Sequence, residues 1–270
     1  MFLYFHAGVD EMIDTIFIDL DETLVESRVA LVTLFENIAK IYLGDKNRGE
    51  CLRNSFRKSC TDKTYTLPHE EYLNRIGYSW DNIFYSDFSG DDPRLFDLKV
   101  ASYEYKHSIV KAVLNDYGIS DFTLIDSIIR FIFEKWVDYY RPFADAYSFL
   151  NECKKYKKYI VTNGFVDIQK RKIQHCGLTH RFEGIYVSGK YGVGKPNVEF
   201  FENVLRDTGA NKNSTVMIGD NLSTDILGAT NTGMKSIYKK AGHVNIDKNA
   251  VDATAVIENL TEIPRLLLTI

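Results

Sequence analysis

The chain has 270 residues, of which 45% are hydrophobic and 13% aromatic, and its formal net charge at pH 7 is −4. This length suits one large or two modest domains, and the composition predicts a globular chain with a buried core. The charge balance, with no long basic run, excludes the electrostatic footprint of a protein that binds a nucleic-acid polymer. No apolar run approaches the length of a membrane span, so we expect no membrane partner.

The four cysteines form no C-x-x-C pair and have no spacing with histidine that would suit a metal. They are Cys51, Cys60, Cys153 and Cys176. We interpret them as small buried hydrophobic residues of a protein in a reduced, cytoplasmic setting. Residues 1–11 are apolar but lack the basic start of a signal peptide, and Met12 directly precedes the first predicted strand. We therefore predict that residues 1–11 are an N-terminal extension.

The first third of the chain predicts one strand followed by helices. An apolar run from Ile16 predicts the strand, and a helical pattern follows from about residue 31 to Gly44, which suits a helix end. Residues 45–96 are polar and broken by proline and glycine, with a short helix indicated only around 69–75. Two longer helices are predicted over 97–117 and 122–140. We conclude that residues 26–140 form an all-helical insert.

From residue 141 onward, predicted strands and helices alternate. The strands are 159–162, 184–187, 215–218, 235–238 and 255–257, and the helices are 144–156, 166–176, 196–209 and 224–231. Such alternation predicts an α/β fold, in which a Rossmann-like parallel sheet is covered by helices on both faces. The first strand belongs to the same sheet, so we predict a core of residues 12–25 and 141–270 with a helical cap of residues 26–140.

Two carboxylates stand at the carboxyl end of the first strand. Asp19 and Asp21 are two residues apart, so in extended backbone they point to the same side, where open parallel sheets bind ligands. Two carboxylates about 4 Å apart repel by roughly 4 kcal/mol at an effective dielectric near 20, so either one is protonated or a cation lies between them. Oxygen ligands of this kind suit Mg²⁺. The plainer interpretation is that Asp19 caps the next helix and Asp21 is solvated.

Three further polar clusters follow later strands. Thr162 and Asn163 can present donors to an anion, or simply cap the next helix. Lys195, between glycines and a proline, is a point charge suited to phosphate, or a solvated surface lysine. Asp220 fits a metal ligand, whereas Asp225 fits either the same site or the first turn of a helix. Together these clusters predict a crevice for Mg²⁺ and a phosphoryl group.

These residues resemble a known family. In chain order, Asp19-Leu20-Asp21-Glu22-Thr23, Thr162-Asn163-Gly164, Lys195-Pro196 and Gly219-Asp220-x-x-x-x-Asp225 resemble the four motifs of the haloacid dehalogenase-like (HAD) phosphohydrolase superfamily. The resemblance runs from residue 14 to about residue 257, and the helical insert resembles the α-helical cap of the family. The residues from Ser223 to Ala229 and the Lys-Pro-Asn form are most similar to pyrimidine 5′-nucleotidases of the YjjG type and N-acylneuraminate-9-phosphatases.

The resemblance implies a role for each motif residue. Asp19 is expected to be the nucleophile that forms an aspartyl-phosphate. Asp21 is expected to act first as the general acid and then as the base. Thr162 and Asn163 are expected to bind phosphoryl oxygens, and Lys195 to neutralise charge on the phosphate and on Asp19.

The family also implies a metal. Asp220 is expected to bind Mg²⁺ together with Asp19 and the backbone carbonyl of Asp21, while Asp225 supports the metal or Lys195. An acid at position 21 favours phosphoryl transfer, because the dehalogenases of the family lack it and need no metal. We therefore expect a Mg²⁺-dependent phosphatase of small soluble phosphomonoesters, with nucleoside monophosphates ahead of sugar phosphates.

Several alternatives remain open on the sequence. A phosphosugar mutase of the β-phosphoglucomutase type would use the same residues, and a non-catalytic HAD-fold binding module would have lost one of them. A phosphonate hydrolase would need a cap lysine, for which Lys40, Lys46, Lys58 and Lys63 are the candidates. We expect a monomer or a homodimer, whose cap closes on hinges at residues 25–27 and 140–142.

Overall fold

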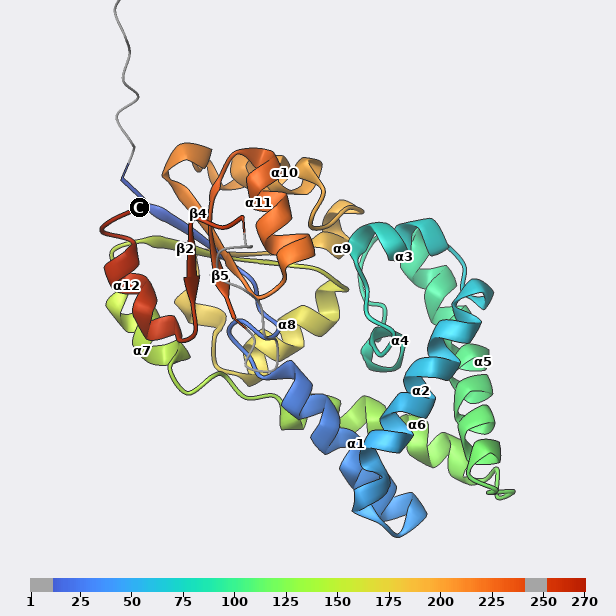
Figure 1. Cartoon of the computed structure of the whole chain (residues 1–270). Coiled ribbons are helices and arrows are strands. Elements are labelled where there is room, and N and C mark those ends of the chain that lie inside the picture. Colours follow the sequence, from blue (N-terminus) through green and yellow to red (C-terminus); the bar gives the residue numbers. More distant parts are fainter. Residues whose placement is uncertain (1–11, 241–251) are drawn as a thin grey trace, which may run out of the picture.

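The computed structural model describes residues 12–240 and 252–270, so the predicted extension at residues 1–11 lies outside the described residues. Figure 1 shows a lobe built on a sheet beside a second lobe made of helices. Within the described ranges, no helix is long and apolar enough to cross a membrane. The arrangement agrees with the predicted Rossmann-like core and helical cap, whereas the domain boundaries at residues 25/26 and 140/141 stay a prediction.

The sheet is built from parallel strands, as the alternating sequence pattern predicted. Its strands are β1 (Thr15–Ile18), β2 (Lys157–Thr162), β3 (Gly184–Val187), β4 (Thr215–Gly219), β5 (Lys235–Lys239) and β6 (Ala255–Ile257). Their order in the described part of the chain is β3-β2-β1-β4-β5-β6, and all paired neighbours are parallel. The first strand of the chain therefore lies at the centre of the sheet, between β2 and β4, and their carboxyl ends meet at one edge.

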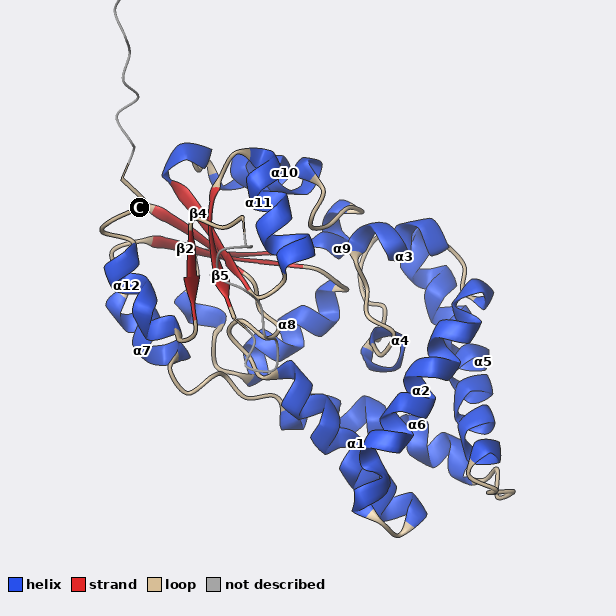
Figure 2. Ribbon diagram, in the orientation of Figure 1, coloured by secondary structure: helices blue, strands red, loops and turns tan. Residues whose placement is uncertain are grey.

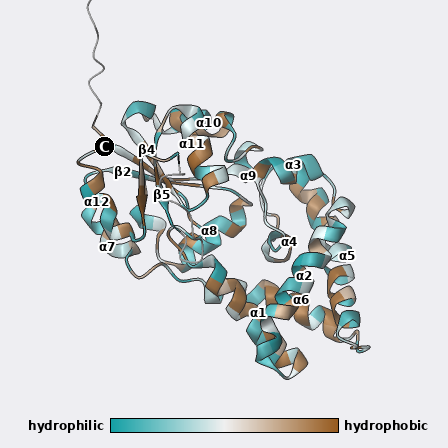
Figure 3. Cartoon of the chain, in the orientation of Figure 1, coloured by the Kyte–Doolittle hydropathy of each residue, from teal (hydrophilic) through white to brown (hydrophobic). Residues whose placement is uncertain are grey.

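Helices cover both faces of this sheet (Figure 2). They are α7 (Ala146–Glu152), α8 (Val166–His175), α9 (Ser188–Tyr191), α10 (Val198–Thr208), α11 (Leu227–Thr232) and α12 (Ile263–Leu266). Side chains alternate along β1, so Phe17 packs in a cluster with Phe200 and Phe201 of α10, while Ile16 and Ile18 belong to the other core cluster. Burial on both faces explains the continuous apolar runs of β1 and β4 (Figure 3), whereas β2 begins with two lysines and β5 has a lysine at each end.

The helical lobe contains six α-helices among the described residues. They are α1 (Ser27–Leu43), α2 (Gly49–Lys63), α3 (Glu70–Ile76), α4 (Asn82–Tyr85), α5 (Pro93–Asp116) and α6 (Leu124–Lys135). The prediction that residues 45–96 are largely irregular was wrong over helix α2. In this helix Leu52, Phe56 and Cys60 are buried at intervals of four residues. Their spacing places them on one face, but the polar residues between them hide the pattern.

Other element ends differ from prediction for local reasons. Helix α5 begins at Pro93 rather than at residue 97, because the Asp92 side chain accepts a hydrogen bond from Arg94 N and caps the helix. Helix α10 begins at Val198 rather than at residue 196, with Asn197 as its cap. The predicted helix over 224–231 is a π-helical turn, Leu222–Ile226, that continues into α11.

The two connections between the lobes run side by side. Val25 forms β-bridges with Asp21 and with Pro142. Glu26 N donates to the carbonyl of Arg141 at 2.9 Å, and a second backbone bond of 2.9 Å joins residues 143 and 24. These segments coincide with the predicted hinges, and the hinge motion itself stays a prediction.

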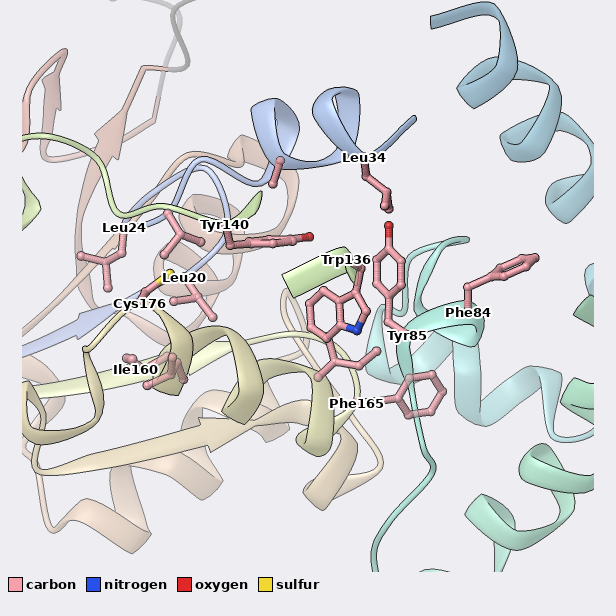
Figure 4. Close-up of a cluster of buried hydrophobic side chains, with 14 of the residues drawn as sticks. Leu20, Leu24, Leu34, Phe84, Tyr85, Trp136, Tyr140, Ile160, Phe165 and Cys176 are labelled. Carbon is pink, nitrogen blue, oxygen red and sulfur yellow. The ribbon is translucent and has the colours of Figure 1, made fainter. Parts of the chain in front are cut away.

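A buried aromatic cluster joins the helical lobe to the core (Figure 4). Trp136 has no exposed surface; its ring stacks on Tyr85 at 4.7 Å and meets Tyr140 edge-on at 5.5 Å. The same hydrophobic cluster includes Phe165, which precedes α8 of the core. Because aromatic side chains bury much apolar surface, this cluster contributes to holding the lobes together.

We predict that Trp136→Ala lowers the free energy of unfolding by about 3–5 kcal/mol, since it opens a cavity where a fully buried ring stood. Urea denaturation followed by circular dichroism measures the change. The matched control is Tyr65→Ala, at an aromatic side chain that is 75% exposed, which should change stability by less than about 0.5 kcal/mol. Equal effects of the two substitutions would contradict the prediction.

Candidate active site

A cavity of about 410 Å³ opens where the three central strands end. Asp19 follows β1, Thr162 ends β2 and Asp220 follows β4, so the parallel pairing brings all three to one edge of the sheet. The sequence-predicted residues that line the cavity are Asp19, Asp21, Thr162, Asn163, Lys195 and Asp220. Asp225 lies next to this group and is fully buried. The structure thus brings together every predicted site residue.

Lys195 is the centre of this arrangement. Its Nζ lies 2.6 Å from Asp19 Oδ1, 2.6 Å from Asp225 Oδ1 and 2.9 Å from the carbonyl oxygen of Val161. Burial acts to lower the pKa of Lys195, but the two carboxylates outweigh it and raise the pKa above its usual value. The ammonium group is therefore charged and held against Asp19, which excludes the interpretation of Lys195 as a solvated surface lysine.

Asn163 fixes the backbone of Lys195. Its Nδ2 donates to the carbonyl of Lys195, and Lys195 N donates to its Oδ1, each at 2.9 Å. A Cβ at Gly77 would come within 2.4 Å of Asn163 Nδ2, and one at Gly194 within 2.5 Å of Oδ1, so glycine is required on both sides. Because Nδ2 carries two protons, one remains for the phosphate contact that the sequence predicts.

The acidic residues carry more negative charge than Lys195 offsets. Burial raises the pKa of Asp19 to about 7, with Asp225 adding to the shift and Lys195 opposing it. Burial, together with Asp19 and Asp225, raises the pKa of Asp220 to about 8. Oxygen atoms of the three carboxylates lie within 4.8 Å of one another. A hard divalent cation fits such an all-oxygen donor set.

Two of the three acids are available to a cation. Asp225 is already engaged, since its Oδ1 faces Lys195 and its Oδ2 accepts a hydrogen bond of 3.1 Å from Asn221 N. Asp19 and Asp220 remain as side-chain ligands, with the backbone carbonyl of Asp21 as the predicted third. The residues therefore fit Mg²⁺, and Asp225 fits the supporting role.

The backbone of β4 makes room for Asp225. A Cβ at Gly219 would come within 2.3 Å of the Asp225 carboxyl group, so only glycine allows that side chain to reach Lys195. The π-helical turn Leu222–Ile226 places Asp225 under the strand end, and Asn221 caps this turn through Ser223 N. Such local π turns are frequent at functional sites.

Asp21 is held by residues that the sequence analysis missed. Lys172 Nζ lies 2.8 and 2.9 Å from its two carboxylate oxygens, Gln169 Nε2 donates to Oδ2 at 3.0 Å, and the Ser27 hydroxyl donates to Oδ1. Burial acts to raise the pKa of Asp21, but these contacts, Lys172 foremost, outweigh it and lower the pKa. The interpretation of Asp21 as merely solvated was therefore wrong.

Gln169 also donates a hydrogen bond to the side chain of Thr162. Its Nε2 lies 2.6 Å from Thr162 Oγ1 and 3.0 Å from the carbonyl of Asn163. Since the Thr162 oxygen accepts this bond, its own hydroxyl proton stays available for an anion in the cavity. Gln169 and Lys172 are three residues apart on α8 and share one helix face. In the sequence, the one sign of these two residues was their spacing of three after Thr162-Asn163-Gly164. Only the fold shows that both side chains contact Asp21.

The helical lobe contributes a polar wall. Arg28, Ser79, Asp81 and Asn82 line the cavity, and burial raises the pKa of Asp81. Among the described residues, Tyr140 is the one aromatic side chain in the lining, and no tyrosine or phenylalanine of residues 65–96 takes part. None of the four lysines suggested for a phosphonate hydrolase lines the cavity either.

The helical lobe is hydrogen-bonded to the loops that carry Asn163 and Lys195. The carbonyl of Ile76 accepts bonds from Gly164 N at 3.2 Å and from Ser188 Oγ at 2.6 Å. Gly194 N donates to the carbonyl of Arg75 at 2.8 Å. The wall over the cavity is therefore in place in this structure.

Comparison with known proteins gives consistent matches. A family model described as haloacid dehalogenase-like hydrolase matches residues 13–233. The chain is 34% identical over 134 residues to a glyceraldehyde 3-phosphate phosphatase of Methanothermobacter thermautotrophicus, covering 47% of this chain and 59% of that protein. It is 31% identical over 128 residues to the pyrimidine 5′-nucleotidase YjjG of Escherichia coli, covering 47% of this chain and 56% of that protein. The matched part thus spans little more than half of each relative.

A solved structure supports the fold. Magnesium-bound YfnB from Bacillus subtilis, a HAD-hydrolase, superposes with a TM-score of 0.61 at 21% identity, covering 95% of this chain and 99% of that one. The match to the family model and the YjjG relative confirm the resemblance seen in the sequence, including its subgroup.

We predict that Gly219→Ala destabilises the protein by about 1–3 kcal/mol, because the added methyl group displaces the Asp225 carboxylate. The control is the same substitution in an Asp225→Ala background, where the conflict with the carboxyl group is removed and only that with the Cβ of residue 225, at 2.5 Å, remains, so the loss should shrink. Urea denaturation of the four proteins measures the coupling. If the two substitutions have additive effects on the free energy of unfolding, crowding at Asp225 is not the cause of the destabilisation.

Proposed function

Because the chain belongs to the haloacid dehalogenase-like hydrolase family, we propose that it is a Mg²⁺-dependent phosphatase that acts on a small phosphomonoester. The observation that carries the proposal is the contact of 2.6 Å between Asp19 and the buried Lys195 at the meeting point of three strand ends. Asp19 is the proposed nucleophile, and Asp220 shares the proposed metal site with it. The names of the two curated relatives, both phosphate-ester hydrolases, support this reaction class.

The proposed first step transfers the phosphoryl group to Asp19. A carboxylate oxygen of Asp19 attacks phosphorus, the bond to the leaving oxygen breaks, and Asp21 supplies the proton that this oxygen takes up. Lys195 and Thr162 bind phosphoryl oxygens, and the charge of Lys195 offsets the repulsion between the carboxylate and the phosphate. When bound, Mg²⁺ supplies further charge neutralisation and orients the phosphate.

The proposed second step releases phosphate. Asp21 takes a proton from a water molecule, whose oxygen attacks phosphorus and breaks the bond to Asp19. The contacts of Asp21 favour this role, since Lys172, Gln169 and Ser27 all donate to its carboxylate and stabilise the ionised form. The first step requires Asp21 to carry a proton, so we propose that its contact with Lys172 loosens when substrate enters.

The lining of the cavity bears on the substrate. Arg28, Ser79, Asp81 and Asn82 offer hydrogen-bonding groups to the leaving group, whereas a single buried aromatic residue, Tyr140, lines the described cavity. A nucleobase gains most of its contact by stacking, while a hydroxyl-rich group gains it by hydrogen bonds. We therefore place sugar and polyol phosphates ahead of nucleoside monophosphates, the reverse of the order that the sequence favoured.

The purified protein should release phosphate from para-nitrophenyl phosphate and from some members of a panel of sugar and nucleoside phosphates. EDTA should abolish release and Mg²⁺ should restore it. Asp19→Asn should reduce release to background, whereas the control Asp116→Asn, at an exposed aspartate outside the cavity, should leave it unchanged. No release by well-folded protein under any of these conditions would overturn the phosphatase proposal.

Lys172→Met should lower kcat by about 10–100-fold with little change in KM, because Asp21 loses the partner that positions its carboxylate. Lys172→Arg should retain most of the activity, since it keeps the charge. Lys170→Met on the exposed side of the same helix is the matched control and should behave as the unmodified protein. Equal kcat values for Lys172→Met and Lys170→Met would contradict the positioning role of Lys172.

A further inference from the structure

A second cavity, of about 560 Å³, lies in the helical lobe and shares no lining residue with the catalytic cavity. Helices α5 and α6 form its sides, and the segment Ser86–Phe88 forms another wall. Nothing in the proposed reaction uses it. The inference drawn from it is independent of the proposed phosphatase activity.

This cavity collects cationic side chains. Lys99, Lys106 and Arg130 all line it, and within residues 12–240 and 252–270 none of their charged side-chain groups forms a hydrogen bond or ion pair. The two acidic residues of the lining have hydrogen-bond partners other than these cations. Asp126 accepts from His107 at 2.7 Å, and Asp87 accepts from Ser89 N at 2.8 Å. Three cationic side chains against two carboxylates leave the lining with an excess of one positive charge, although the whole chain has a net charge of −4.

Lys106 is the most enclosed of the three. Its Nζ lies 5.8 Å from the centre of the Phe88 ring. Burial lowers the pKa of Lys106 to about 8, and the charge of Asp167 opposes the shift. Its ammonium group has thus lost water without gaining a carboxylate partner, and a bound anion would supply the missing interaction.

Part of the remaining lining is apolar and is already in place. Phe88, Ile129 and Phe133 line the cavity beside the cations. The backbone at Phe88 is held in a left-handed conformation, φ 56°, and Phe88 N donates to Ser86 Oγ at 2.9 Å. Ser86 Oγ and Asp87 N both donate to Asp167 of α8 at 2.8 Å, which anchors this wall to the core. Apolar walls with a few directed charges are typical of preformed small-molecule sites.

We propose that this cavity is a binding site for a small organic anion, whose phosphate or carboxylate contacts Lys99, Lys106 and Arg130 and whose apolar or aromatic body lies against Phe88 and Phe133. The charged group and the apolar body are both required, since each matches a different part of the lining. The site is separate from the catalytic cavity.

Pyridoxal 5′-phosphate is a suitable probe, since it combines an aromatic ring, a phosphate and an aldehyde. The uncharged amine of Lys106 adds to the aldehyde carbon, and water leaves as the imine forms. Added borohydride delivers a hydride to the imine carbon while the nitrogen takes a proton, which gives a stable secondary amine. Peptide mass spectrometry then quantifies labelling at each lysine. Pyridoxal, which lacks the phosphate, is the matched control probe.

The expected result is a ratio of phosphate-probe to pyridoxal labelling that is about tenfold higher at Lys106 than at the exposed Lys40. Inorganic phosphate should lower the ratio at Lys106. Arg130→Gln and Lys99→Gln, both at exposed positions, should lower it as well while leaving pyridoxal labelling unchanged. Equal ratios at Lys106 and Lys40, or a ratio unaffected by both substitutions, would overturn the proposal.

Discussion

The ion pairs of Lys195 are the constraint on which the rest of the site depends. Its ammonium group is buried between Asp19 and Asp225, and a buried charge is tolerated only when it is paired. Each neighbour is therefore fixed: Asn163 holds the backbone of Lys195, and Gly219 leaves the space through which Asp225 reaches it. The three acids outnumber the one lysine, and this imbalance makes the site fit a divalent cation.

The parallel sheet supplies the geometry for these pairs. Because β1 lies between β2 and β4, three segments that are far apart in the chain end at the same edge. Motifs at strand ends are therefore predictable from sequence: once the strands are recognised, the site follows from their parallel pairing. Asp19, Thr162 and Asp220 were found in this way, and the first strand was assigned to the sheet although about 140 residues of predicted helices and loops follow it.

Contacts that depend on tertiary packing could not be predicted in the same way. Lys172 and Gln169 stand on an ordinary amphipathic helix, and nothing local shows that their face meets Asp21. Helix α2 was missed because its buried residues are few and its polar residues many. Asp81 lies in a stretch without periodicity, so its place in the cavity wall depends on how α4 docks. In each case the missing information is which surfaces face each other.

Asp21 shows how the two lobes share one site. Its carboxylate is held from the core by Lys172 and from the helical lobe by Ser27, while its backbone pairs with Val25 where the chain leaves the core. Lys172 in turn lies 5.0 Å from the ring of Tyr140, where the chain returns. A shift of the helical lobe would move Ser27 and Tyr140 together and so change the surroundings of Asp21. The predicted closure of the cap would therefore change the surroundings of the carboxylate that we propose as the proton donor.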